Sequence, residues 1–435
     1  MLTAISRYGA RVLPNTEQLV AGCKARGEFI QGPHIARFEA AFAQRAGVEP
    51  SHAIAASYGR MAFYYILQAL ALPTGSEIIL PALTFWVVPE LARVAGLTVV
   101  FADVDPATFT LDPAAFERAI TPATRAVVPT HLYGLPCDMD PIVTIARRHG
   151  LAIVEDCAHA LGATYRGRPV GTLGDAALFS FQTLKPLNAF GGGMAVIQDR
   201  AVARRVREQV DALPWPDEGR VHNRFKIGRA QRFFTQPGMF TLLAFPILWT
   251  ASWFNANPDV YLWEPIRPLD PLPAAYTERF PNAQAAVGLA ALERLDAWTA
   301  ASQAHARAID RVLAGSPGVQ APVVPADRTH VYYQYCVYVP DRDDLVIRCI
   351  RRGIDIETLH VDVCTRLALF SDLQSAPMPG ADRASAAVQV PVYASLSDLQ
   401  VDRIARAVRR AVDGRGETEH HARVGLPQRV RGSRR

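Results

Sequence analysis

Short apolar runs alternate with amphipathic stretches through the first half of the chain. Strands are expected at residues 52–56, 77–80, 98–102, 125–130, 151–154, 176–181 and 194–197. Helices are expected to begin near residue 35, after the turn 57–60 and after residues 84–86, and to span 113–120. Strands that alternate with helices predict a mostly parallel sheet covered by helices. Active sites in such sheets lie at the carboxyl ends of the strands.

The last third of the chain predicts a smaller α/β domain. A helix is expected over residues 283–313, a strand over 331–339, and helices over 343–352 and 399–412. We therefore expect an N-terminal segment and large domain at 1–270, with an apolar insertion at about 215–270, and a small domain at 271–414. Residues 415–435 are rich in Arg, Gly and His and are expected to form a disordered tail.

The candidate chemistry lies in the stretch LAIVEDCAHALGATYRGRPVGTLGDAALFSFQTLKPLNAFGGGMAV, residues 151–196. Asp156 ends one apolar run, and Lys185 follows another. Pyridoxal 5′-phosphate (PLP) needs a lysine amine that holds it covalently and a carboxylate that keeps its ring nitrogen protonated. On spacing alone, a salt-bridged loop lysine and an aspartate that caps a helix are the more ordinary explanation.

Several motifs in this stretch resemble those of the DegT/DnrJ/EryC1/StrS sugar aminotransferase family. EDCAHALGA, GDAALFSFQTLKPL and GGG occur in the family's order, and FSFQTLK ends at Lys185 as the family's Phe-Ser-Phe-x-x-x-Lys run does. The resemblance extends from about residue 29 to about residue 410, and several motifs in order are far more specific than any one of them. It implies PLP as cofactor, transamination, and the PLP-dependent transferase fold of type I.

The resemblance also implies which residues act in catalysis. Lys185 would hold PLP and then move protons, and Asp156 would keep the ring nitrogen protonated. His131 opens HLYG, a further family motif, and is expected to shape the wall of the pocket. Some family members have histidine in place of the lysine and catalyse dehydration, so Lys185 favours transamination.

Five further residues are implied as cofactor contacts. A strand, a glycine turn and a helix N-terminus at residues 52–60 form a generic geometry for binding phosphate, although most such turns only connect elements. The family binds the PLP phosphate at this turn, so the resemblance implies Gly59 and Arg60. In the family, Ser180 would join them and Phe85 would stack on the ring. His159 stands where the family usually has glutamine, and would hydrogen-bond near the ring. A histidine with a purely structural role on the same helix face is the alternative.

Residues 274–295 resemble a segment that reaches the active site of the neighbouring subunit in the family. Arg279, Asn282 and Gln284 match the family pattern, whereas Thr277 replaces an asparagine. The resemblance therefore implies a homodimer with shared active sites, in which Arg279 and Asn282 are candidates from the neighbour. Residues 353–370 depart most from the family pattern, at a loop that often borders the substrate.

The expected reaction moves an amino group from an amino acid, glutamate or glutamine, to a keto group of a nucleotide-linked sugar. One alternative keeps the chemistry but uses a lipid-linked or aminocyclitol carbonyl acceptor at a membrane surface. Another is an inactive regulatory or binding relative, against which the intact pair of Asp156 and Lys185 counts.

Composition excludes several other classes of protein. The chain of 435 residues is 50% hydrophobic and 20% charged, which is typical of a globular protein long enough for two domains. A net charge of +5 is too modest to suggest nucleic acid as a partner. Six cysteines without C-x-x-C spacing argue against a zinc site or a disulfide framework. The first residues lack the apolar run of a signal peptide, so a cytoplasmic location is expected.

Residues 233–258 form an apolar stretch that family members of ordinary length are expected to lack. No charged residue occurs between Arg232 and Asp259, but prolines and polar residues interrupt the stretch, so a membrane span is not expected. One explanation is a helical hairpin buried at the dimer interface or over the substrate cleft. The other is an element lying in one leaflet, peripheral to the inner membrane. Five preceding cations favour attachment to anionic lipid, although arginines also bind the phosphates of nucleotides: Arg220, Arg224, Lys226, Arg229 and Arg232.

Overall fold

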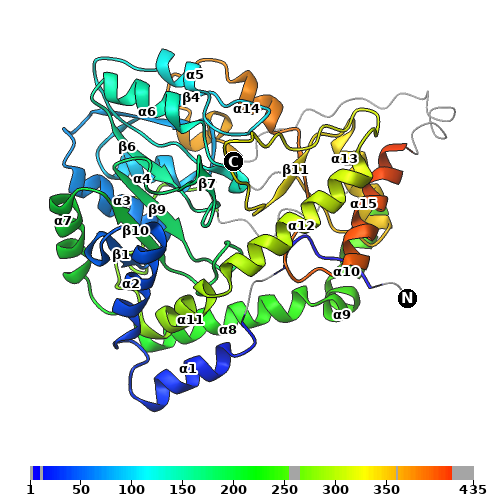
Figure 1. Cartoon of the computed structure of the whole chain (residues 1–435), viewed down its shortest axis with the longest axis horizontal. Coiled ribbons are helices and arrows are strands. Elements are labelled where there is room, and N and C mark those ends of the chain that lie inside the picture. The colour runs from blue at the N-terminus through cyan, green and yellow to red at the C-terminus, as the bar shows by residue number, and fades with distance from the viewer. Residues whose placement is uncertain (1–2, 10–12, 254–264, 359–360, 414–435) are drawn as a thin grey trace.

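The computed structural model describes residues 3–9, 13–253, 265–358 and 361–413. A central sheet of seven strands has the order β1-β10-β9-β6-β5-β2-β4 (Figure 1). Its strands are β1 (Ala53–Ala56), β2 (Glu77–Pro81), β4 (Thr98–Ala102), β5 (Thr124–Val127), β6 (Ala152–Asp156), β9 (Ala176–Ser180) and β10 (Gly193–Ile197). All neighbours pair in parallel except β10, which is antiparallel to both β9 and β1. The expected mostly parallel α/β sheet is confirmed.

Helices cover both faces of this sheet because its strands are apolar on both faces. In β1, Ile54 faces the core shared with α3 (Gly59–Leu70), α4 (Val87–Val94) and α7 (Arg200–Asp211). The alternate residue Ala53 faces α2 (His34–Ala46) and α11 (Asn282–Leu292) on the other side. Helices α5 (Pro113–Arg118) and α6 (Met139–Arg148) cover the far end of the second face, and α1 (Thr16–Ala25) lies outside α11 (Figure 1).

A second, antiparallel sheet has the order β11-β14-β12 and belongs to the C-terminal third of the chain. Its strands are β11 (Tyr335–Val337), β12 (Glu357–Thr358) and β14 (Val388–Val390), packed with α12 (Leu295–Leu313), α13 (Arg342–Arg351) and α15 (Asp398–Asp413). The helix α14 (Pro379–Ala384) precedes β14. Residues 3–9 lie along this part of the chain, where the Ile5 N–H donates to the Gly353 carbonyl oxygen at 2.9 Å.

Short elements complete the chain. The short helical turns are η1 (Pro50–His52), η2 (Leu132–Gly134), η5 (Cys364–Arg366) and η6 (Ala368–Phe370). Two small sheets have two strands each: β7 (Thr164–Tyr165) pairs with β8 (Arg168–Pro169), and β3 (Leu83–Thr84) pairs with β13 (Asp362–Val363). The pairing of β3 with β13 matters for the site, because it joins the loop before Phe85 to the C-terminal third.

Two expectations for the last third are wrong in their bounds. The single helix expected over 283–313 is two helices, since α11 ends at Leu292 and α12 begins at Leu295. A turn at residues 293 and 294 separates the two helices; most of α11 is buried between α1, α2 and the sheet, whereas α12 packs against α15. The strand expected over 331–339 covers only Tyr335–Val337.

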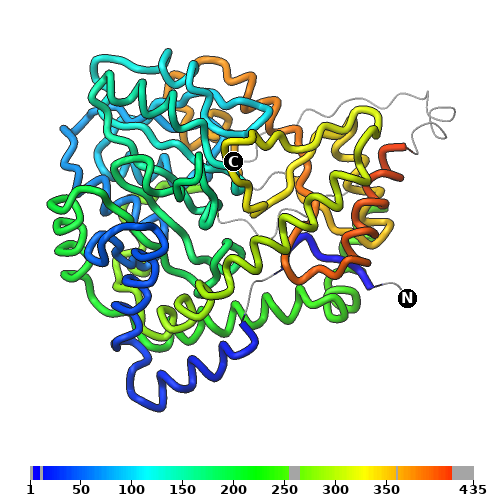
Figure 2. Tube along the Cα trace, in the orientation of Figure 1, coloured from blue at the N-terminus to red at the C-terminus, as the bar shows by residue number. Residues whose placement is uncertain are grey.

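The expected apolar insertion folds as a run of helices at the lower edge of the molecule, green in Figure 2. It comprises α8 (Glu218–Thr235), α9 (Pro237–Met239), the π-helical turn η3 (Phe240–Ala244) and α10 (Phe245–Trp253). Several of its large apolar side chains are exposed, so within one chain it is not a buried hairpin. Among the described residues, no helix is both long and apolar enough to cross a bilayer. Residues 254–258 of the expected stretch, and the expected tail at 415–435, lie outside the described residues.

The packing of α2 against α11 generates a stability prediction. Phe38 is fully buried, with its ring centroid 5.2 Å from that of Phe181 and 6.1 Å from that of Phe280. Phe38→Ala removes these contacts and leaves a cavity, which is expected to lower the free energy of unfolding by about 3–5 kcal/mol. Leu399→Ala on α15, where the side chain is 82% exposed, is the control and should change it by about 0.5 kcal/mol or less. Equal denaturant midpoints for the two variants would contradict this packing.

Candidate active site

A cavity of about 280 Å³ opens at the carboxyl ends of β6 and β9. All seven side chains or glycines expected to contact a cofactor line it: Gly59, Arg60, Phe85, Asp156, His159, Ser180 and Lys185. Parallel pairing explains part of this convergence, because Asp156 at the end of β6 lies opposite Leu178, two residues before Ser180 on β9. The sequence therefore located the cavity, and the sheet brings the residues together.

Lys185 lies in the loop after β9 with its amine directed at a histidine. Its Nζ is 2.7 Å from Nε2 of His159. The other ring nitrogen of His159, Nδ1, accepts from the Tyr133 N–H at 3.4 Å. Burial lowers the pKa of Lys185 to about 8, nearby Asp156 opposes the shift, and Arg60 adds to it. The lysine is thus held close to the point at which it loses its proton.

Asp156 is almost fully buried at the end of β6. Its Oδ1 accepts from the Ala158 N–H at 2.9 Å. Burial raises the pKa of this carboxyl group, and both the Ala158 N–H and the Lys185 amine oppose that shift. A carboxylate with one backbone donor in a cavity is well placed to hold a cation or a protonated ring nitrogen.

Aromatic rings enclose His159. Tyr333 stacks on the imidazole with centroids 4.3 Å apart, and Lys185 Nζ lies 5.1 Å from the centroid of the same Tyr333 ring. Tyr133 lies roughly parallel to the imidazole, with centroids 6.3 Å apart. His159 therefore stacks on aromatic rings and contacts the lysine, so it is part of the cavity rather than a histidine of the helix surface.

The N-terminus of α3 meets the end of β9 at Gly59. A Cβ atom at Gly59 would lie 2.7 Å from the Phe179 carbonyl oxygen and 2.9 Å from Ser180 Cβ, so only glycine allows this approach. The first N–H groups of a helix have no partner within it and bind anions together with the helix dipole. The turn thus places backbone donors and the Ser180 hydroxyl at one end of the cavity.

Arg60 lies in a cluster of aromatic rings. Its guanidinium carbon is 5.1 Å from the centroid of Tyr276, 5.4 Å from Phe85 and 5.6 Å from Tyr58, and Nη1 donates to the Tyr276 hydroxyl. Arg224 of α8 lies 5.0 Å from the centroid of the Tyr58 ring and donates to its hydroxyl at 3.0 Å. Two cations therefore contact one tyrosine beside the cavity.

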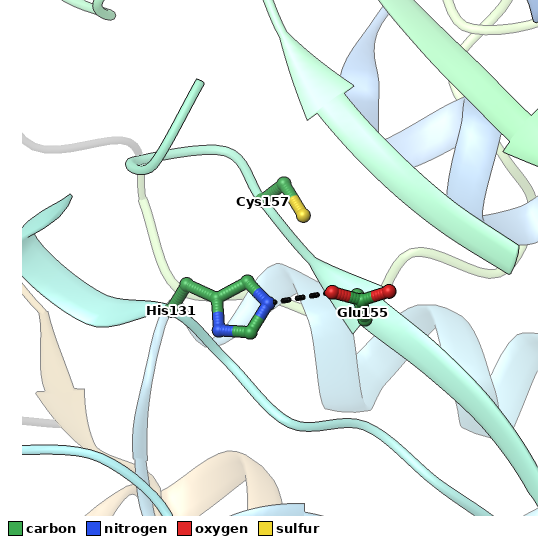
Figure 3. A group of neighbouring side chains, drawn as sticks. All are labelled: His131, Glu155 and Cys157. Atoms are coloured by element: carbon green, nitrogen blue, oxygen red, sulfur yellow. Dashed lines mark hydrogen bonds and ion pairs between the residues drawn. The ribbon is translucent and has the colours of Figure 1, made fainter. Parts of the chain in front are cut away.

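Behind the cavity, the carboxylate of Glu155 is the centre of a fully buried hydrogen-bond network (Figure 3). It accepts from the backbone N–H groups of residues 171, 173 and 174 at 2.7–2.8 Å and from His131 Nε2 at 2.9 Å. His131 Nδ1 accepts from the Cys137 N–H at 3.0 Å. The expectation that His131 shapes the pocket wall is therefore wrong: it is buried behind the wall, where the sequence alone could not distinguish it from a cavity residue.

His131, Glu155 and Cys157 are also close enough together to be considered as metal ligands (Figure 3). Both ring nitrogens and both carboxylate oxygens already have hydrogen-bond partners. Burial raises the pKa of the Cys157 thiol to about 12, so the thiolate that a metal requires is unfavourable. This group is a structural network that supports the strand carrying Asp156.

The chain matches the DegT/DnrJ/EryC1/StrS aminotransferase family over residues 14–409. It belongs to this family. The aminotransferases of the family depend on PLP, and the chain is accordingly a PLP-dependent aminotransferase with the type I fold that the sequence predicts.

The chain is 33% identical over 387 residues to the GDP-perosamine synthase of Caulobacter vibrioides, covering 87% of this chain and 90% of that protein. It is 31% identical over 402 residues to the pleiotropic regulatory protein of Geobacillus stearothermophilus, covering 91% and 94%. Among solved structures, DesI in the presence of its TDP-sugar product has a TM-score of 0.74 at 26% identity, with 97% of this chain and 96% of that chain covered.

The two residues of this DegT/DnrJ/EryC1/StrS member that were expected to reach a neighbouring subunit differ from each other in exposure. Asn282 is fully buried in its own chain, where it accepts from the His34 N–H at 2.7 Å and donates to the Glu28 carbonyl oxygen at 2.6 Å. It therefore cannot reach a neighbouring site, and the expectation for Asn282 is wrong. Arg279 remains partly exposed, paired with Asp211 at 2.6 Å.

Several cavity residues of this aminotransferase had no signal in the family motifs. Tyr333 and Glu357 come from the C-terminal third, and Tyr8 comes from the N-terminal segment; all three line the cavity. The Tyr8 hydroxyl donates to the almost fully buried Glu357 carboxylate. Only the departure of residues 353–370 from the family pattern could have drawn attention to Glu357.

The position of Lys185 predicts a pH dependence in the cofactor-free aminotransferase. Its acylation should have a midpoint near pH 8, well below the 10.5 of an ordinary lysine, because burial disfavours the charged amine. Asp156→Asn should lower the midpoint further, since the Asp156 charge raises the pKa of the lysine. Competitive acylation followed by peptide mass spectrometry measures this, with exposed Lys226 as internal reference. A midpoint near 10.5, or an upward shift in Asp156→Asn, would contradict the geometry.

Proposed function

We propose that this aminotransferase moves an amino group from an amino acid, glutamate or glutamine, to a keto group of a nucleotide-linked sugar, with PLP bound in the cavity at the ends of β6 and β9. The observation that carries the proposal is the single cavity that Asp156, Lys185 and the N-terminus of α3 share. A nucleotide-linked acceptor is supported by two similar proteins: one is a GDP-perosamine synthase, and the other, DesI, has a solved structure in the presence of its TDP-sugar product.

The cavity residues fit PLP. Lys185 would hold it, Asp156 would contact its ring nitrogen, and Gly59, Arg60 and Ser180 would bind its phosphate, with Phe85 against the ring. The close approach at Gly59 and the N–H donors of α3 suit a phosphate group. The buried Asp156 carboxylate would accept a hydrogen bond from a protonated ring nitrogen. When bound, PLP supplies an electron sink for the electrons left at the carbon that loses its proton.

Lys185 is the group that moves the proton at the substrate carbon. A pKa of about 8 leaves a useful fraction of its amine neutral near pH 7 while its conjugate acid remains a proton donor. His159 orients the amine through Nε2, and Tyr333 fixes His159 by stacking. Asp156 stabilises positive charge in the same cavity, so the proton donor and the charge stabiliser act from fixed positions.

Positive charge beside the cavity suits an anionic acceptor. Arg60 and Arg224 both contact the ring of Tyr58, which itself lines the cavity. An arginine can bind two phosphate oxygens at once. Because Arg60 is assigned to the PLP phosphate, Arg224 is the cation that would contact the diphosphate of a nucleotide. A regulatory role is the second candidate, because one relative at 31% identity is a pleiotropic regulatory protein. The complete cavity with Lys185 and Asp156 favours the enzyme.

Substitution of the central pair tests the proposal. Borohydride treatment followed by peptide mapping should attach PLP to Lys185, and Lys185→Ala should abolish both the label and turnover. Asp156→Asn should retain the fold but lose about 10²–10⁴-fold in turnover with glutamate and keto sugars linked to GDP, UDP or dTDP. The exposed Asp372→Asn is the matched control and should leave turnover unchanged. A label on another lysine, or normal turnover in Asp156→Asn, would overturn the assignment.

We also propose a homodimer in which Arg279 reaches the neighbouring active site. Sedimentation should show a dimer, and Arg279→Glu and Lys185→Ala should each be inactive alone. An equal mixture of the two variants after subunit exchange should regain up to about a quarter of the activity, because about half of its dimers are mixed and one of the two sites in each mixed dimer receives both native residues. Asp211→Asn removes the partner of Arg279 within its own chain and serves as the control. An active monomer, or no recovery on mixing, would refute shared sites.

A further inference from the structure

An apolar surface covers the outer side of the insertion, and we name it the α8–α10 surface. Leu242 and Ile247 are 70% and 69% exposed, and Trp253 is 56% exposed. The other large apolar side chains exposed on it are Phe233, Phe234, Leu243 and Trp249. Exposed apolar residues occur singly on most proteins, whereas a contiguous group of large ones marks a site of interaction.

The helix α10 is apolar on both of its faces. Phe245 and Leu248 pack against the core of the C-terminal third, and Ser252 is fully buried. The exposed side of the helix carries Ile247, Trp249 and Trp253, with Thr250 among them, and has no charged residue, whereas the exposed side of a surface helix normally carries charged residues. A helix that is apolar on all sides is normally buried on all sides. The core of the C-terminal third covers only the inner side of α10, so the exposed apolar side remains to be explained.

Positive charge borders the α8–α10 surface at both ends. No charged residue occurs from Phe233 to Trp253. On the α8 side lie Lys226, Arg229 and Arg232, of which Arg229 has an acidic neighbour, Glu17, at 3.5 Å. On the α13 side, the Arg351 guanidinium lies 4.3 Å from the Trp253 ring centroid. Two other cations of α8 have partners elsewhere, since Arg220 pairs with Glu278 and Arg224 contacts Tyr58.

We propose that the α8–α10 surface docks on the anionic surface of a lipid bilayer. Apolar and aromatic side chains enter the boundary between headgroups and acyl chains, and a cationic border contacts lipid phosphates, which is the pattern of interfacial helices. A second copy of the chain fits less well. It would bring an equally cationic border against this one, and a subunit interface also needs a polar rim with hydrogen bonds.

The docked orientation brings the active site close to the bilayer. Gln231 of α8 lines the active-site cavity and is exposed, and Phe234 follows it by one helical turn. The mouth of the cavity therefore adjoins the α8–α10 surface. Docking does not depend on the proposed acceptor, but it places the cavity where an acceptor attached to a lipid could enter.

Vesicle flotation of the full chain tests the docking. At low salt, the protein should float with vesicles containing phosphatidylglycerol, bind at least tenfold less to pure phosphatidylcholine, and dissociate as salt is raised. Leu242→Ser with Ile247→Ser should reduce binding to anionic vesicles at least tenfold, and Lys226→Gln with Arg232→Gln should reduce its salt sensitivity. Leu399→Ser, at an exposed leucine on α15, is the matched control and should bind as the native chain does. Failure of the native chain to bind either vesicle would overturn the proposal.

Sedimentation without lipid separates the bilayer from a second copy. The Leu242→Ser and Ile247→Ser double variant should keep the oligomeric state and turnover of the native protein. A smaller assembly would identify the α8–α10 surface as a subunit interface and overturn the proposal. Quenching of tryptophan fluorescence by brominated lipid in the native protein gives a second readout, since Trp249 and Trp253 should enter the bilayer. No quenching in vesicles that bind the protein would also contradict this docking.

Discussion

A carboxyl group buried in a protein loses its hydrogen bonds to water, and protein donors must replace them. Glu155 meets this constraint with three backbone N–H groups and His131 Nε2. These bonds tie the loop at residues 171–174 to the end of β6, immediately behind the cavity. Neighbouring residues of a strand point to opposite faces, so the fixed orientation of Glu155 directs Asp156 to the cavity. The position of the Asp156 carboxylate in the cavity depends on that of its buried neighbour, Glu155.

Asp156 and Lys185 share a second electrostatic constraint. Burial raises the pKa of Asp156 and lowers that of Lys185, so each group tends toward its neutral form, and each opposes the shift of the other. The fold balances these effects with few contacts: one backbone N–H for Asp156, and His159 for Lys185. A site balanced in this way can exchange protons near neutral pH, which transamination requires.

The sequence predicted the central sheet and the catalytic end of the cavity, because both depend on local signals. Apolar runs define the strands, and motif residues such as Gly59 and Lys185 lie directly after them. Contacts between distant segments had no such signal. Tyr8 meets Glu357 across almost the whole chain, and Tyr333 reaches His159 from the C-terminal third. His131 and Asn282 matched family motifs but turned inward, and only three-dimensional packing decides the direction of a side chain.

The pairing of Tyr8 with Glu357 has a consequence for how the protein could change in evolution. The catalytic end of the cavity is built into the strands of the central sheet, where most substitutions would disturb the core. The opposite end is built from residues 3–9 and from the segment around β12. These segments meet through the Tyr8–Glu357 hydrogen bond, the Arg7–Asp355 ion pair and backbone hydrogen bonds of Ile5. Mutations there can alter which molecules enter while the strands around Asp156 stay intact. One end of the cavity is free to diverge, and the other keeps the chemistry unchanged.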